Sequence, residues 1–174
     1  SKKLNKKVIL LTNNKEAEAK EFADSTYVFP KQTEPYTYNT STYLGFILAY
    51  EKDDPKKIYN HLKNIEKLDF WFFKKFKKFY IIVPTKFNGI IRMIQVKFIE
   101  LFGRKIARDV ETIEYVKHAT TVVPSDELFI SFGEKNNYGK NNLFIPMPKD
   151  ASYATMMALA YFIVGKIQKA QPQY

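Results

Sequence analysis

The sequence contains no cysteine. A disulfide framework and a metal site with thiolate ligands are therefore both excluded. The sequence also lacks any run of about 18 uncharged apolar residues, so we expect no membrane-spanning helix. Residues 1–30 do not follow the pattern of a secretory signal peptide. From these absences we expect a cytoplasmic protein.

What the chain does contain is enough for a folded domain. Its 174 residues suffice for one ordinary domain, or for one domain and part of another. Hydrophobic residues make up 45% of the chain and aromatic residues 16%, which excludes global disorder. The formal net charge is +10 at pH 7, and most of the cations are lysines.

Lysines cluster at two places. Residues 1–7 contain four of them, and residues 69–79 interleave four more with six aromatic residues. Such a composition is typical of surfaces that bind nucleic acid or an anionic membrane. The alternative is a segment whose aromatic rings pack on the domain while its lysines face water. Because no nucleic-acid-binding motif accompanies the second cluster, we prefer the alternative, and we expect neither nucleic acid nor a membrane as a partner.

The first 68 residues predict a βαβ unit followed by two helices. Residues 8–12 form a continuous apolar run, which is typical of a strand covered on both faces. The turn at Thr12-Asn13-Asn14 can cap a helix. The expected elements are strands at 8–12 and 26–29, and helices at 15–22, 43–50 and 56–68. The short crossover helix implies that the two strands pair in parallel.

A second unit is expected from Tyr80 onward, with residues 69–79 as the linker. The pattern predicts strands at 80–84, 106–110, 128–132 and 143–146, and helices at 90–102, up to about 118, and 151–168. Residues 133–142 are polar and too few to hold a helix. Alternating strands and helices predict an α/β fold with a mainly parallel sheet.

The order of several short motifs resembles the sugar isomerase (SIS) domain family. A strand ending in Thr12-Asn13, a helix rich in Glu and Ala, the motif Phe22-Ala-Asp24 and a strand leading to Glu34 resemble the second half of one SIS domain. Lys97-Phe-Ile-Glu100 matches the Lys-x-x-Glu on the first long helix of a second SIS domain, and residues 111–119 resemble its Glu-rich segment ending in His-Gly. The chain thus resembles the C-terminal part of a double-SIS protein of the glucosamine-6-phosphate synthase isomerase type.

Several features depart from the family pattern. The Ser-x-Ser-Gly-x-Thr phosphate loop is absent, and the glycine-rich turn after the Tyr80 strand is replaced by Thr85-Lys-Phe-Asn-Gly89. Ala119 stands where the family has glycine, and a βα pair is missing between Phe132 and Leu143. The resemblance implies a three-layer αβα sandwich with an incomplete first unit. Its divisions would be residues 1–68 as the C-terminal half of a first SIS-like domain, 69–79 as the basic aromatic linker, and 80–174 as a shortened second domain.

Glu100, His118 and Lys97 are the candidate catalytic residues. A carboxylate on an otherwise apolar helix is costly unless it is paired or used, and Lys97 is spaced to pair with Glu100. Imidazole titrates near neutral pH, and His118 follows Glu114 by one helical turn. In the resembled family the glutamate moves a proton between C1 and C2 of an open-chain sugar phosphate, and the histidine opens the ring. The alternative for all three residues is an ordinary ion pair. We expect the remaining histidine, His61, to be merely solvated.

The candidate substrate-binding residues lie in turns and helix caps. Asn88 and Gly89 precede the long helix and can present backbone amides to a phosphate, although many α/β turns do so. Thr40, Ser41 and Thr42 can donate hydroxyls to a ligand or simply cap a helix, and Glu34 is included through the resemblance. No cluster of His, Asp and Glu has the spacing of metal ligands, so we expect no metal. The enediol chemistry of the family needs no organic cofactor.

These observations favour a sugar-phosphate isomerase of the aldose–ketose type, or a fragment of one. The alternative is a non-catalytic module that binds a sugar phosphate or serves in assembly. An incomplete first unit leaves a sheet edge and a helix face uncovered. We therefore expect a homodimer, or association with a missing N-terminal portion.

Overall fold

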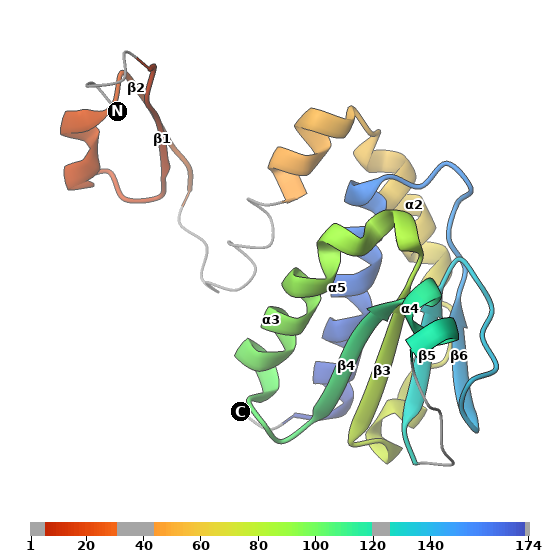
Figure 1. The fold of residues 1–174 in the computed structure, drawn as a ribbon. Helices are drawn as coiled ribbons and strands as arrows, with labels where there is room; N and C mark the ends of the chain where they lie inside the picture. The colour runs from red at the N-terminus through yellow and green to blue at the C-terminus, as the bar shows by residue number, and fades with distance from the viewer. Residues whose placement is uncertain (1–5, 31–43, 120–125, 173–174) are drawn as a thin grey trace. The chain divides into compact units, whose positions relative to one another are not determined.

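A computed structural model describes residues 6–30, 44–119 and 126–172, and it divides the chain into two compact units, Ser1–Tyr43 and Leu44–Tyr174 (Figure 1). The first unit contains β1 (Ile9–Thr12), the 3-10 helix η2 (Glu18–Phe22) and β2 (Ser25–Val28). The two strands pair in parallel, as the short crossover predicts. None of the residues described in this unit is buried.

The second unit is built on a four-stranded parallel sheet. Its strands are β3 (Lys78–Val83), β4 (Ala107–Thr112), β5 (Leu128–Phe132) and β6 (Asn141–Ile145), in the order β4-β3-β5-β6. All three pairings are parallel, which confirms the predicted α/β class. Every residue of β5 is buried, as a central parallel strand requires.

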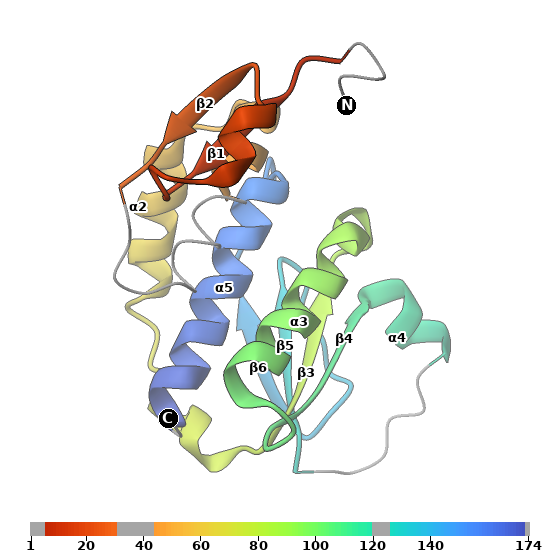
Figure 2. The same cartoon turned by 90° about the vertical axis from the view of Figure 1, so that its left-hand side faces the viewer.

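The helices cover the two faces of this sheet unequally. They are α2 (Pro55–Ile65), α3 (Ile91–Phe102), α4 (Ile113–Ala119), α5 (Tyr153–Ala170), a helix of residues 44–51, and the 3-10 helices η3 (Trp71–Lys75) and η4 (Thr85–Ile90). Ile81 and Val83 of β3 share one core with α3 and α5, whereas Tyr80 and Ile82 face α4 (Figure 2). Among the residues described, two long helices thus lie on one face of the sheet and one short helix lies on the other. The three-layer sandwich stays a prediction.

The division of the chain differs from the one expected from the sequence. Helix α2 was assigned to the first unit, yet Ile58 packs against Ala154 and Ala158 of α5. Residues 69–79 were expected to form a linker, yet Phe73 and Phe79 lie fully buried in the main core. The boundaries at residues 68 and 80 are therefore corrected to a single boundary at 43/44, because tertiary partners of these apolar residues lie on α5 and β3.

The connection from β5 to β6 contains no helix. Residues 133–140 return the chain across the sheet on the side of α4, where Tyr138 joins the Tyr80–Phe129 cluster. Gly139 lies so close to the Phe129 ring that a Cβ there would overlap it. Residues 133–140 thus form a polar loop without a helix, as the sequence predicts. None of the helices in the described part of the chain has the length and apolar character needed to cross a bilayer.

Candidate functional site

Lys97 and Glu100 form an ion pair on α3. The Lys97 ammonium lies 2.5 Å from Glu100 Oε2, and the two side chains are 11% and 38% exposed. Lys97 Nζ also lies 5.7 Å from the centre of the Tyr161 ring of α5. The lysine stem is buried between helices while the carboxylate reaches solvent. The structure therefore pairs the Glu100 carboxylate with Lys97, as the i,i+3 spacing predicts.

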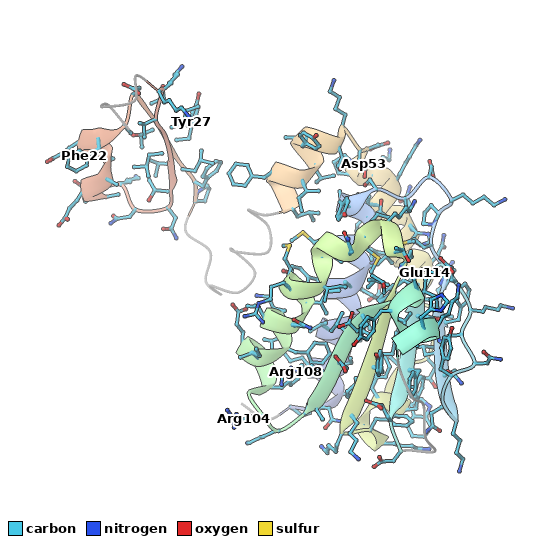
Figure 3. All side chains as sticks on the ribbon, viewed as in Figure 1. Phe22, Tyr27, Asp53, Arg104, Arg108 and Glu114 are labelled. Atoms are coloured by element: carbon cyan, nitrogen blue, oxygen red, sulfur yellow. The ribbon has the colours of Figure 1, made fainter. Side chains whose placement is uncertain are left out.

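His118 lies in an exposed network on α4. Its Nε2 is 3.5 Å from Glu114 Oε2, and its side chain is 78% exposed. Lys117 Nζ approaches the other oxygen of the same carboxylate at 2.8 Å. The hydrogen bond and charge of Lys117, with a smaller effect of His118, lower the pKa of Glu114 below its usual value. This arrangement holds Glu114 ionised near His118 at the surface (Figure 3).

Within one chain, Glu100 and His118 lie on opposite faces of the sheet. Helix α3 packs with α5 on one face of the sheet, and α4 packs on Tyr80 and Ile82 of the other face. The sheet itself therefore separates the two candidate catalytic groups. The predicted chemistry, which uses both of them, would need a second copy of the chain.

The turn that contains Asn88 and Gly89 is closed. It forms the 3-10 helix η4, in which Phe87 N–H donates to Pro84 O at 2.8 Å and Ile91 N–H donates to Asn88 O. Gly89 lies against Tyr153, so that a Cβ would stand 3.3 Å from the phenolic oxygen. A phosphate role for Asn88 and Gly89 stays a prediction. Glu34, Thr40, Ser41 and Thr42 lie outside the described residues.

A pocket of about 280 Å³ opens in the second unit, where the sequence indicated no site. It lies between the starts of α2 and α5, and α5 follows directly after β6. It is therefore at the carboxyl edge of the sheet, where α/β proteins commonly bind ligands. Its lining residues are Lys52, Asp53, Asp54, Lys57, Ile58, His61, Pro148, Asp150, Ala151 and Thr155. We call it the α2–α5 pocket.

Two of its carboxylates cap the two helices. Asp54 Oδ1 accepts a hydrogen bond from Lys56 N at 2.9 Å, at the start of α2. Asp53 accepts one from the Ser152 hydroxyl, whose oxygen in turn accepts from Ala154 N and Thr155 N at the start of α5. These bonds fix both helix starts around the pocket and occupy both carboxylates (Figure 3 labels Asp53).

Other polar groups of the pocket are available to a ligand. The side chains of Lys52, Lys57 and Asp150 make no hydrogen bond or ion pair with any residue in the described part of the chain. His61 Nε2 lies 3.0 Å from Pro146 O, and a carbonyl oxygen can only accept, so the neutral ring carries its proton on Nε2. The other nitrogen, Nδ1, is then an acceptor. The expectation that His61 is merely solvated is corrected, because it is half-buried and bound to the loop after β6.

No sequence pattern indicated this pocket. Its charged residues come from segments 52–61 and 148–155, which are almost a hundred residues apart, and each segment alone looks like a solvated helix start. The only local signal was an acidic residue before each helix. Asp54 is explained as the cap of α2, whereas Ser152 and not Asp150 caps α5. Among the residues described, no group of three His, Cys, Asp or Glu side chains could hold a metal ion.

The fold and the pocket together define an α/β protein with a parallel sheet and a polar site at its carboxyl edge. No family model, curated protein or solved structure matches the chain. Its similarity to SIS domains therefore stays a prediction.

Proposed function

We propose that this protein binds a sugar phosphate in the α2–α5 pocket and acts as a binding module without catalysis of its own. The observation that carries the proposal is the pair of unpartnered ammonium groups, Lys52 and Lys57, in a pocket that also contains His61 and Asp150. The resemblance to sugar isomerases supports the same class of ligand.

The available groups of the pocket are complementary to a ligand that carries both a phosphate ester and hydroxyl groups. Ammonium groups form charge-assisted hydrogen bonds with phosphate oxygens. The Asp150 carboxylate accepts hydrogen bonds, and so does Nδ1 of His61 when the ring is neutral. Sugar hydroxyls can donate hydrogen bonds to both. The pocket volume of about 280 Å³ lies at the lower end of the range of ligand sites, so a single monosaccharide fits better than a nucleotide or an oligosaccharide.

A catalytic role is the second candidate. Its support is the nearly buried Lys97, which pairs with the Glu100 carboxylate while leaving that carboxylate open to solvent. As in the resembled family, Glu100 would move the proton between C1 and C2, and His118 of a second copy would open the ring. This candidate requires a homodimer. Under either proposal, the ligand is an intermediate of central carbohydrate metabolism, and we place the protein in the cytoplasm.

Calorimetric titration of the full chain tests the binding proposal. We expect glucose 6-phosphate to bind, and glucose without the phosphate to bind much more weakly. Lys52→Gln and Lys57→Gln should each weaken binding about tenfold, because each removes a charge-assisted hydrogen bond. Lys56→Gln is the matched control, since Lys56 is a neighbouring lysine that does not line the pocket. Equal affinity in all three variants, or absence of binding, would overturn the proposal.

A turnover assay on the same preparation separates the two candidates. Interconversion of glucose 6-phosphate and fructose 6-phosphate can be followed by NMR. A binding module should show affinity and no turnover. If turnover occurs and Glu100→Gln reduces it by about 10²–10⁴-fold while affinity is retained, the catalytic candidate replaces the first.

A further inference from the structure

The basic aromatic segment is held rigidly at the edge from which β3 starts. Phe70 and Phe73 are buried in the main core. The side-chain amide of Gln171, just after α5, donates to Phe73 O at 3.0 Å and to Phe76 O at 2.7 Å. The backbone of the 3-10 helix η3 is therefore held from inside by Gln171.

Trp71 is the aromatic residue of this segment that stays outside. Its side chain is 52% exposed, and the ammonium groups of Lys75 and Lys74 lie 4.4 Å and 5.0 Å from its ring centre. The preferred interpretation of the segment, rings packed and lysines in water, holds for Phe70 and Phe73 but not for Trp71. The two cations are attracted to the ring, so an exposed apolar group and two positive charges stand together at one place on the surface.

Further cationic and apolar groups lie at the same edge. Arg104 is exposed in the loop that joins α3 to β4 (Figure 3). This loop reaches the same edge, because β4 starts beside the start of β3, where Ala107 N donates a hydrogen bond to Lys77 O. Leu68, which precedes η3, is 38% exposed. We call Leu68, Trp71, Lys74, Lys75 and Arg104 the amino-edge patch. It lies at the opposite edge of the sheet from the α2–α5 pocket.

We propose that the amino-edge patch docks on the surface of a bilayer that contains anionic phospholipids. Tryptophan prefers the level of the lipid headgroups, where its apolar ring and its N–H are both accommodated. Lysine and arginine close to such a surface are attracted to its phosphates. The patch combines the two kinds of group on a rigid support.

The geometry favours a lipid surface over single-stranded nucleic acid. A base would need the face of the indole ring for stacking. Lys74 and Lys75 already lie over that ring. At a membrane these ammonium groups can stay beside the ring while they contact phosphates. The proposal departs from the sequence-based expectation of no membrane partner, which assumed that all the aromatic rings of residues 69–79 pack on the domain; Trp71 does not.

Vesicle binding of the full chain tests this proposal. Trp71 is the sole tryptophan of the sequence, so its fluorescence reports on the patch directly. We expect co-sedimentation with vesicles of phosphatidylcholine and phosphatidylserine, a blue shift of Trp71 emission, and loss of both in high salt or on pure phosphatidylcholine. The double variant Lys74→Gln/Lys75→Gln should bind about 30-fold more weakly, from about fivefold per lysine.

The control is Lys56→Gln/Lys149→Gln, which removes the same charge from exposed residues near the opposite edge. Circular dichroism should show that both double variants are folded. The proposal is overturned if the protein does not bind anionic vesicles, or if the control weakens binding as much as the Lys74/Lys75 variant. It is also overturned if a single-stranded oligonucleotide changes Trp71 emission and the vesicles do not.

Discussion

Gln171 should be a residue on which the stability of the second unit depends. Its side chain is only 5% exposed and makes three hydrogen bonds. The amide nitrogen donates to the carbonyl oxygens of Phe73 and Phe76, and Oε1 accepts from Lys77 Nζ. These bonds join the end of α5 to the segment that leads into β3. Gln171→Ala removes all three.

The expected cost follows from the burial of the acceptors. A typical hydrogen bond contributes about 0.5–1.5 kcal/mol net, and a buried group left without a partner costs about 1–3 kcal/mol. The bond to Phe73 O is buried, whereas those of Phe76 O and Lys77 are partly accessible to water. We therefore expect Gln171→Ala to lower the free energy of unfolding by about 2–4 kcal/mol. Most of this cost comes from the Phe73 carbonyl.

Urea denaturation followed through Trp71 fluorescence measures this change within the affected segment. Gln168→Ala is the matched control, because it makes the same substitution at an exposed position near the end of α5. Gln171→Glu keeps an acceptor for Lys77 but cannot donate to the two carbonyls, so it should be at least as destabilising as the alanine. If the free energies of unfolding of Gln171→Ala and Gln168→Ala differ by less than about 0.5 kcal/mol, the hydrogen bonds of Gln171 do not stabilise the unit as typical hydrogen-bond energies predict.

Three further changes test other parts of the fold. Gly139→Ala should cost about 1–3 kcal/mol in urea denaturation, since its Cβ would overlap the buried Phe129 ring; a neutral effect would mean that the β5–β6 loop takes another path. Ile58→Ala should lower the free energy of unfolding of the second unit, followed by Trp71 fluorescence, by about 2–4 kcal/mol, because it leaves a cavity against α5. If this free energy does not change, α2 does not belong to the core of the second unit. Burial, and then Asp109, raise the pKa of Glu111 above its usual value, so the ionised form destabilises the native state at neutral pH. Glu111→Gln should therefore be more stable than wild type at pH 7. The difference should shrink once the pH falls below that raised pKa and be gone below the usual pKa of a glutamate; a constant difference across the range would refute this.

The parallel sheet could be predicted mainly because its two central strands, β3 and β5, are largely apolar runs. Residues 128–132 were predicted as a strand and are observed as β5 with the same bounds. The runs that start at Val8 and Tyr80 also correspond to observed strands, β1 and β3. Coverage of the Val8 strand on both faces was wrong for the described residues, since none of β1 is buried and β1 pairs only with β2. A strand covered on both faces carries its signal locally. The predicted helix at 15–22 is instead the short η2, which has no buried residue to stabilise a longer helix.

The division into units could not be predicted because it depends on distant partners. Residues 69–79 look like a linker, since lysines interrupt the aromatic residues without a regular period. In the structure Phe73 and Phe79 are fully buried while Trp71 is exposed. Which rings are inside depends on α5 and on the hydrogen bonds of Gln171, and neither is visible in the segment itself. The α2–α5 pocket was missed for the same reason.

The sheet separates Glu100 from His118, and this separation allows the two proposed functions to be told apart. Glu100 belongs to a helix on one face and His118 to a helix on the other, so no rotation of side chains within one chain can join them. The α2–α5 pocket, by contrast, is complete within Leu44–Tyr174. Binding in the pocket should therefore be independent of protein concentration. Turnover per chain that uses both Glu100 and His118 should rise with protein concentration as chains associate. Measuring affinity and turnover per chain at several protein concentrations therefore tells the two sites apart.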